Sequence, residues 1–245
     1  MTTAAPEYDR IARWYDEAVQ AGSLLHELAI GSLLALASDV RGLKVCDLAC
    51  GQGAASREFA RRGASVVGVD ISLGMLQLAR LHDEGEHLDI AYVLDDAQGL
   101  HALASASFDG IVSNLALMDI AVLSLALRSA ARVLRPGAWL VFSITHPCFQ
   151  TPASSWVSHA DGGAAREVAG YFQEGRWFST NPTGVRGQVG AYHRTLGTYV
   201  TALIGAGFSL EGLNEPRAAG RLAEQWPGDQ EVPSLLCARW RKVAS

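Results

Sequence analysis

Apolar and polar residues alternate along most of the chain in blocks whose lengths suit strands and helices. Five almost wholly apolar runs are typical of buried parallel strands, and helical segments follow most of them. The predicted strands are 43–49, 65–70, 89–96, 108–114 and 138–145, and the predicted helices are 54–62, 72–82 and 119–134. This order predicts a parallel sheet that is covered by helices on both faces.

Helical spacing also precedes the first predicted strand. A first helix is indicated by four residues that recur at helical intervals, Tyr8, Ile11, Ala12 and Tyr15, and a second helix by the segment 24–37. We therefore expect a helical cap over residues 1–40.

The last part of the chain returns to the alternating pattern. Residues 195–208 predict a helix that closes at glycine, and 208–216 and 234–242 predict a hairpin-like pair of strands at the end of the sheet. No internal repeat or low-complexity linker divides the chain, so we expect one domain over 1–245.

The alternation fails between residues 146 and 194. This stretch is rich in glycine and aromatic residues, and it is too long for an ordinary connection. We expect a functional insertion that folds over a ligand site as a lid. Two interpretations of its aromatic residues stay open: they stack on a flat substrate, or they form a hydrophobic cluster of their own. The residues concerned are Trp156, Tyr171, Phe172, Trp177 and Phe178.

Composition narrows the function classes. The chain has 245 residues, a net charge of −5 and no block of Lys or Arg, which argues against nucleic acid as a partner. No basic start with an apolar core opens the chain and no long apolar run follows, so we expect a cytoplasmic protein without a membrane partner. The cysteines, which lack metal-ligand spacing, are expected to be buried reduced thiols, and no metal is expected. They are Cys46, Cys50, Cys148 and Cys237.

The segment "VCDLACGQGAASREFA", residues 45–60, carries the first chemical signal. A strand that passes through a glycine turn into a helix presents free N–H groups to a ligand. "GQGAAS" half-matches a dinucleotide-binding pattern, which leaves a nicotinamide-dependent oxidoreductase as one alternative. Asp47, four residues before Gly51, argues against it, because this carboxylate would repel a pyrophosphate and attract an ammonium group.

Carboxylates follow two further strands. Asp70 ends the second predicted strand, and Asp95 and Asp96 end the third. Each alone would be ordinary as a cap. Because the carboxyl ends of parallel strands meet at the edge where open α/β sheets bind ligands, we expect these acids to share one site with Asp47.

Together these segments resemble a class I S-adenosylmethionine-dependent methyltransferase of the small-molecule kind, over roughly residues 7–145. The resemblance implies a Rossmann-like doubly wound α/β sheet of about seven mainly parallel strands with a C-terminal antiparallel strand, N-terminal helices and an insertion after the fifth strand. "VCDLACGQG" resembles the glycine-rich first motif of the family, with Ala49 where many members have glycine. It implies that Asp47 faces the methionine amino group, directly or through water, and that Gly51 and Gly53 let the backbone approach the cofactor.

Three further segments resemble cofactor-binding parts of the family: "VVGVDIS", "DDAQGL" and "FDGIVSNLALMDI". "VVGVDIS" implies that Asp70 binds the ribose diol. "DDAQGL" implies that Asp96, beside Asp95, accepts from the adenine amine while the Ala97 N–H reads the ring. The implied packing residues are Ile71 and Met75 near the adenine, and Asn114 and Leu115 at the methionine end.

The segment "YDRIARWYDEA" resembles the family's helix that closes over the cofactor. Tyr8 and Tyr15 are seven residues apart and share a helical face, where their hydroxyls could reach the cofactor carboxylate. The alternative is that both rings only pack on the core.

Few side chains could remove a proton from a methyl acceptor. The candidates are His146 directly after the fifth strand, His193 at the end of the insertion, and Tyr192 beside it. His146 could equally be a turn residue before Pro147. The other histidines are expected at the surface: His26, His82, His87, His101 and His159.

The sequence therefore predicts transfer of a methyl group from S-adenosylmethionine to an O or N atom of a small, aromatic or heteroaromatic metabolite, with S-adenosylhomocysteine as the product. The expected partner is a small-molecule substrate, and the protein is expected to be a monomer or homodimer. Besides the oxidoreductase, a protein that binds S-adenosylmethionine in a non-methylating role remains an alternative.

Overall fold

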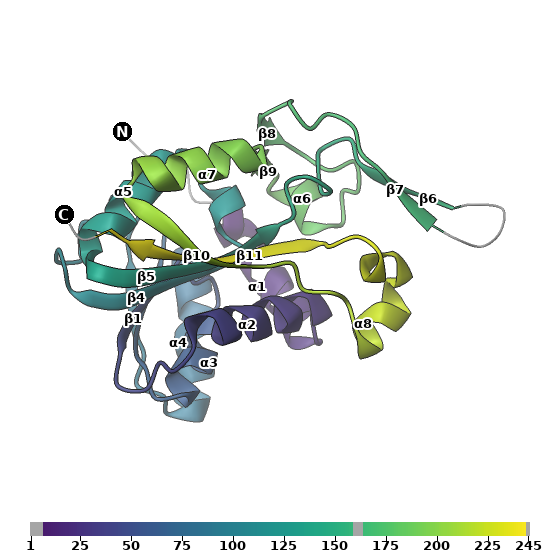
Figure 1. Cartoon of the computed structure of the whole chain (residues 1–245). Coiled ribbons are helices and arrows are strands. Elements are labelled where there is room, and N and C mark those ends of the chain that lie inside the picture. The colour runs from purple at the N-terminus through teal and green to yellow at the C-terminus, as the bar shows by residue number, and fades with distance from the viewer. Residues whose placement is uncertain (1–6, 159–163, 244–245) are drawn as a thin grey trace, which may run out of the picture.

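The structure, a computed structural model, describes residues 7–158 and 164–243 (Figure 1). A seven-stranded sheet runs through its middle in the order β10-β11-β5-β4-β1-β2-β3. The strands are β1 (Lys44–Leu48), β2 (Ser65–Asp70), β3 (Ala91–Leu94), β4 (Phe108–Asn114), β5 (Leu134–Thr145), β10 (Phe208–Asn214) and β11 (Leu235–Lys242). In this sheet β11 alone runs opposite to the other six strands, so the predicted fold class is confirmed.

Helices cover both faces of the sheet (Figure 1). The helices α2 (Leu24–Ala37), α3 (Ala54–Arg61) and α4 (Leu73–Glu86) lie on one face, and α5 (Leu123–Val133) and α7 (Leu196–Gly205) lie on the other. The central strands read as continuous apolar runs because both faces are buried: Val45, Cys46 and Leu48 of β1 are wholly inaccessible to solvent.

One core cluster shows why a glycine sits within a central strand. Phe59 of α3 packs near Trp139 of β5, with ring centroids 6.5 Å apart. A side chain at Gly110 of β4 would lie 2.2 Å from the Trp139 ring. Because only glycine leaves room there, the indole covers the strand backbone directly.

The boundary between α5 and β5 differs from its prediction. The helix begins later than expected, after a short 3-10 turn η1 (Leu117–Asp119), and β5 starts at Leu134 rather than at 138. Pro136 disfavours helical conformation in the residue before it, so the chain becomes extended at once.

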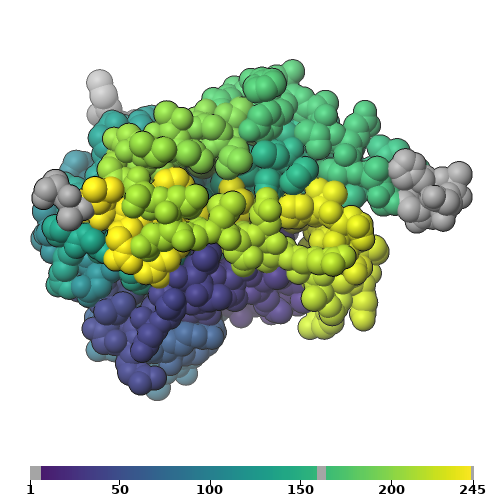
Figure 2. Space-filling view, in the orientation of Figure 1, coloured from purple at the N-terminus to yellow at the C-terminus, as the bar shows by residue number. Residues whose placement is uncertain are grey.

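The insertion forms two small antiparallel sheets, β6 (Ser155–Ser158) with β7 (Ala164–Glu167) and β8 (Gly175–Trp177) with β9 (Ala191–His193), around a short helix α6 (Val185–Gln188). In the space-filling view it forms one end of the molecule, beside the yellow segment of α8 (Gly220–Gln225) and the 3-10 turn η2 (Pro227–Gln230) (Figure 2). Trp156 packs there on the backbone of Gly228, where a Cβ would lie 2.5 Å from the ring.

The described part of the N-terminal cap holds α1 (Glu7–Gln20) and α2. Residues 1–6 of the predicted cap, and His159 of the insertion, lie outside the described residues. Within the described ranges no single helix is long and apolar enough to cross a membrane, although α1 and α2, bent by 81°, pass that test as a pair by length and composition.

Candidate active site

A cavity of about 410 Å³ lies at the carboxyl ends of β1, β2 and β4. Thirteen of the sequence-predicted site residues line it: Tyr8, Tyr15, Asp47, Ala49, Gly51, Asp70, Ile71, Met75, Asp96, Ala97, Asn114, Leu115 and Tyr192. They come from segments that are far apart in the chain, and the topology brings them to one edge of the sheet. This edge is where open α/β sheets place their ligands.

The turn after β1 leaves bare backbone facing the cavity. Ala49 and Gly51 both have φ of +55°, a conformation that favours glycine. A Cβ at Gly51 would meet no atom within 4 Å. That open space at the cavity wall admits a ligand against the backbone.

Gly53 packs against Tyr92 and precedes α3. It does not line the cavity, and a Cβ there would lie 2.6 Å from the Tyr92 hydroxyl. With φ of +80° it begins α3 in a left-handed conformation. Tight packing on Tyr92 and the left-handed backbone therefore both favour glycine at this position.

Asp47 is wholly buried, and among the described residues only one of its two carboxylate oxygens has a hydrogen-bond partner. The Ser56 hydroxyl donates to its Oδ2 over 2.6 Å, whereas Oδ1 has no hydrogen-bond partner among the described residues. Burial raises the pKa of this carboxyl to about 7. A ligand that carries an ammonium group would supply the missing partner and favour the ionised form.

Asp70 is fixed by backbone donors. The Gly51 N–H donates to Oδ2 and the Ser72 N–H to Oδ1, each over 2.8 Å. Burial raises the pKa of the carboxyl, while these N–H groups oppose the shift. Since a carboxylate oxygen can accept more than one hydrogen bond, both oxygens keep capacity for the two hydroxyls of a ribose.

The two acids after β3 separate in the structure. Asp96 lines the cavity, and its carboxylate accepts from the backbone and side-chain nitrogens of Gln98. Asp95 does not line the cavity, because its oxygens accept from the N–H groups of Asp96 and Ala102. Asp95 thus closes a turn, and the cavity lining lends no support to its predicted place in the cofactor site.

Helix α1 is fastened to the start of α4. Asp9 accepts from the Ser72 hydroxyl and from the Gly74 N–H, the latter over 2.9 Å. Tyr8 and Tyr15 contact each other edge to face, with ring centroids 5.6 Å apart, and the Tyr8 hydroxyl donates to Asp119 over 3.2 Å. Both tyrosines thus form a wall of the cavity as well as packing on each other.

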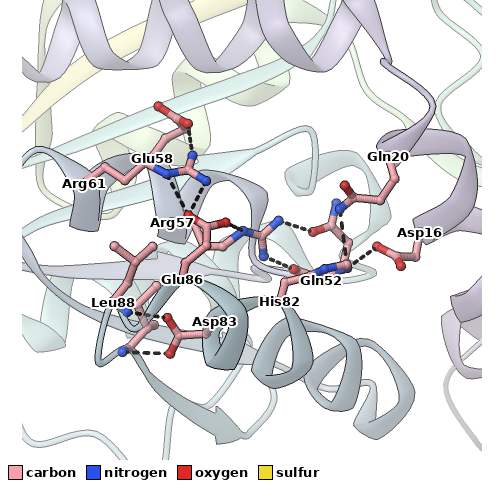
Figure 3. A network of polar contacts seen from close by, with 11 residues as sticks. Asp16, Gln20, Gln52, Arg57, Glu58, Arg61, His82, Asp83, Glu86 and Leu88 are labelled. Atoms are coloured by element: carbon pink, nitrogen blue, oxygen red, sulfur yellow. Dashed lines mark hydrogen bonds and ion pairs between the residues drawn. The ribbon is translucent and has the colours of Figure 1, made fainter.

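A buried arginine supports the glycine turn from behind (Figure 3). Arg57 of α3 donates to the Gln52 carbonyl over 2.8 Å and to the Gln52 side-chain oxygen over 3.2 Å. Its Nε lies 3.4 Å from Glu86 of α4. No motif in the sequence predicts this contact, because a charged residue in a helix is most often exposed to solvent.

Comparisons with known proteins agree with this geometry. A family described as "Methyltransferase domain" matches residues 46–142. A solved S-adenosylmethionine-dependent methyltransferase from Mesorhizobium loti superposes with a TM-score of 0.74 at 33% identity, over 86% of this chain and 96% of that chain. The chain belongs to the class I S-adenosylmethionine-dependent methyltransferases.

Two curated relatives of this methyltransferase-family chain are O-methyltransferases by name. A malonyl-[acyl-carrier protein] O-methyltransferase of Pseudescherichia vulneris is 37% identical over 139 residues, which cover 57% of this chain and 52% of that protein. A ubiquinone biosynthesis O-methyltransferase of Alkalilimnicola ehrlichii is 28% identical over 134 residues, 54% of each protein. The chain thus spans about half the length of the curated relatives it matches.

His146, the first candidate base in this family member, lies away from the cavity. Its Nε2 is 2.7 Å from the Glu215 carboxylate, and its Nδ1 accepts from the Cys148 N–H over 3.2 Å. Both ring nitrogens are therefore occupied in a turn, and burial lowers the pKa of the imidazole. These contacts favour the alternative interpretation, in which His146 is a turn residue before Pro147.

His193 is also absent from the first cavity. It is buried, and its Nε2 lies 2.8 Å from the Tyr171 carbonyl. It faces a second, smaller cavity on the other side of Tyr192. Of the three predicted acid and base candidates, only Tyr192 lines the first cavity.

The insertion reaches the first cavity with other residues than its predicted aromatic ones. Arg176, Val189 and Ala191 line the wall beside Tyr192. None of the five aromatic residues does so, although Trp177 lines the second cavity. Phe172 is 87% exposed.

Sequence reasoning missed two groups in the cavity wall. His26, expected at the surface, lies 2.9 Å from the Tyr15 hydroxyl, and burial lowers the pKa of its imidazole to about 4. Asp119 forms an ion pair with Arg186 of the insertion. No spacing rule links these pairs along the chain, so only the folded structure reveals them.

The four cysteines are free thiols. Cys46 and Cys237 are buried, as predicted, and Cys50 and Cys148 are half-buried. Among the residues that the structure describes, no group of three or more His, Cys, Asp or Glu side chains could hold a metal ion.

Proposed function

We propose that this chain transfers the methyl group of S-adenosylmethionine to an oxygen or nitrogen atom of a small organic acceptor. The unpartnered Oδ1 of Asp47 carries the proposal. A buried carboxylate oxygen without a donor is unfavourable, and it points to a cationic ligand group that completes it. S-adenosylmethionine presents such a group in its ammonium.

The charge of the cavity supports a cationic cofactor over a dinucleotide. Five acids line it, namely Glu7, Asp47, Asp70, Asp96 and Asp119, against one arginine, Arg176, which pairs with Glu7. A pyrophosphate at the glycine turn would face this acidic surface. The nicotinamide-dependent alternative therefore loses support.

The residues that would hold the cofactor fit its parts. Asp47 would bind the amino group, Asp70 the ribose hydroxyls, and Asp96 with the Ala97 N–H the adenine. Ile71 and Met75 would pack on the ring, and Gly51 would leave the backbone free to approach. We place the methionine end between Asn114 and Leu115, where Tyr8 and Tyr15 close the wall.

Bound S-adenosylmethionine supplies an electrophilic methyl group, so most of the bond chemistry belongs to it. The work left to the chain is to align the acceptor and to exclude water, which can lower a barrier by about 7–11 kcal/mol. Helix α1 and the insertion would act as lids for this purpose. Tyr192, the predicted candidate that faces the cavity, would position the acceptor.

An aromatic or heteroaromatic acceptor suits the walls of this cavity. Tyr8, Tyr15 and Tyr192 offer ring faces and edges, and Leu115 and Ile120 add apolar surface. Flat ligands pack well in such surroundings. An oxygen acceptor would parallel the names of the two curated relatives.

Calorimetric titration of the purified protein with S-adenosylmethionine, S-adenosylhomocysteine and NADH tests the cofactor. We expect binding of both adenosyl compounds and none of NADH. Acceptors are then screened by mass spectrometry for the gain of one CH₂ unit, with release of S-adenosylhomocysteine as the second readout. Binding without any such release across the screen would favour the non-methylating alternative, and binding of NADH alone would overturn the proposal.

A further inference from the structure

A second cavity of about 290 Å³ adjoins the first. Ala191 and Tyr192 line both cavities, so the Tyr192 side of β9 forms a shared wall. The remaining walls come from the end of β5 at Thr145, from the insertion, and from Met118 of η1 and Tyr199 of α7.

The two cavities carry opposite charge. Three arginines and one histidine line the second cavity, Arg166, Arg186, Arg194 and His193, and no Asp or Glu of the described residues does so. The first cavity has five acids and one arginine. A molecule that spans both would meet a negative surface at one end and a positive surface at the other.

Arg186 is neutralised, but Arg194 is not. Arg186 pairs with Asp119. Arg194 is 8% exposed and donates to the carbonyls of Leu117, Ile120 and Ala121 over 3.2, 2.5 and 3.0 Å. Its guanidinium stacks 5.3 Å from the Tyr192 ring centroid. Carbonyls and a ring face carry no net charge, and no described carboxylate lies within 4 Å to form an ion pair with Arg194.

Among the described residues, Arg166 also has no ion-pair partner, and one of its guanidinium nitrogens has no acceptor. Its Nε donates to the Phe149 carbonyl over 2.9 Å, and its Nη2 donates to Gln150 and Ser154 over 2.7 and 2.6 Å. Within the described ranges its Nη1 has no acceptor and no ion-pair partner, although the charge of Asp229 acts on it from a greater distance. A half-buried cation without a counterion is costly, and an anionic ligand would offset that cost.

We propose that the second cavity binds an anionic group of the methyl acceptor, a carboxylate or a phosphate, while the reactive atom lies in the first cavity beyond Tyr192. This inference rests on the proposed methyl transfer and specifies its acceptor. Arg166 and Arg194 attract the anionic end, and the acids of the first cavity repel it. The opposite charges of the two cavities thereby orient the acceptor with its neutral hydroxyl or amine toward the methyl group.

The test measures binding, and S-adenosylhomocysteine is held at saturation throughout. A set of aromatic and aliphatic carboxylic acids is titrated calorimetrically, each beside its primary amide, together with phosphate monoesters of the matching alcohols. We expect acids or phosphates to bind and their amides not to bind. Comparison of the acid and phosphate arms identifies which anion the cavity prefers.

Two variants act on the cavity in different ways. Arg166→Gln removes a cation and is expected to weaken binding of the anion at least about tenfold, a typical value for one charged hydrogen bond. Thr180→Glu leaves every arginine in place, adds a carboxylate at the cavity wall, and is expected to weaken the same binding. Arg128→Gln, an exposed arginine of α5, makes the same change of charge outside the cavity and should leave affinity unchanged.

The outcomes separate this inference from the proposed function. If S-adenosylhomocysteine binds but no acid or phosphate does, or acids and amides bind alike, the inference is overturned and methyl transfer stands. Unchanged anion affinity in both Arg166→Gln and Thr180→Glu overturns it as well. If the protein does not bind S-adenosylhomocysteine, the proposed function fails first and the inference falls with it.

Discussion

The Ser56 hydroxyl donates to Oδ2 of Asp47 over 2.6 Å, and the other oxygen of this carboxylate is buried without a partner in the described part of the chain. One serine therefore holds the side chain in place and leaves one oxygen for a ligand. Burial raises the pKa of the carboxyl to about 7, so ionisation of Asp47 should be coupled to binding of a cation.

The first prediction is a pH-dependent affinity for S-adenosylhomocysteine. Its ammonium favours the ionised carboxylate, so binding below about pH 7 must also release a proton. Affinity should rise with pH, by up to about tenfold per pH unit, and level off above about pH 7. Calorimetry between about pH 6 and pH 8, in buffers of different ionisation enthalpy, measures both the affinity and the proton release.

Asp47→Asn is the matched variant for this prediction. It keeps the size of the side chain and an acceptor for Ser56 but removes the titrating charge. We expect affinity to fall about 10- to 100-fold at neutral pH and the pH dependence to flatten. A wild-type slope in this variant would assign the titration to another group.

The second prediction separates two aspartates that the sequence treats alike. Asp70→Ala should reduce affinity for S-adenosylhomocysteine by at least about 100-fold, because it removes the proposed ribose acceptor and the anchor of the Gly51 turn. Asp95→Ala should leave affinity unchanged and lower the free energy of unfolding by about 1 kcal/mol, since Asp95 only closes a turn. Calorimetry and urea unfolding measure the two effects. An equal loss of affinity in both variants would mean that the ribose site is misplaced.

The comparison of Asp70 with Asp95 shows what the sequence can predict. Apolar runs and their spacing determine which strands are parallel and where they end, so the sheet and the edge of the cavity followed from sequence. The direction of a side chain at that edge depends on the next turn. The side chain of Asp95 accepts from the Ala102 N–H, seven residues ahead, and this local contact holds it outside the cavity lining.

Contacts between distant residues were beyond sequence reasoning. His146 directly follows a strand, as a catalytic residue would, but its Nε2 pairs with Glu215, 69 residues later. His26 reaches Tyr15 because the chain bends by 81° between α1 and α2. No periodicity or motif records such pairs, because they arise from the packing of elements against one another.

The third prediction concerns the acid and base candidates, assayed with the first acceptor that the screen identifies. His146→Ala should keep the wild-type kcat and lose stability, because both ring nitrogens are occupied outside the first cavity. Tyr192→Ala should raise KM for the acceptor about tenfold or more while affinity for S-adenosylhomocysteine stays unchanged. A large loss of kcat in His146→Ala, at a temperature where the variant remains folded, would restore it as a catalytic residue.

The last prediction concerns the fastening of α1 over the cavity. Asp9 accepts from the Ser72 hydroxyl and from the Gly74 N–H, and it thereby ties α1 to the turn that follows Asp70. Asp9→Ala should free this helix, with a loss of about 1 kcal/mol in the free energy of unfolding and faster dissociation of S-adenosylhomocysteine. Trp14, on the same helix and 38% exposed, offers a fluorescence signal for stopped-flow measurement of the dissociation rate.

Glu17→Ala is the control for this prediction, since Glu17 is an exposed acid of the same helix. Glu17→Ala changes the charge by the same amount without altering a contact to α4. S-adenosylhomocysteine should therefore dissociate from this variant at the wild-type rate. A faster rate in Asp9→Ala alone would mean that α1 limits cofactor exit. If S-adenosylhomocysteine dissociates from both variants at the wild-type rate, the wall formed by Tyr8 and Tyr15 is held by its own contacts, Tyr8 with Asp119 and Tyr15 with His26. Asp9 would then serve only to cap α4.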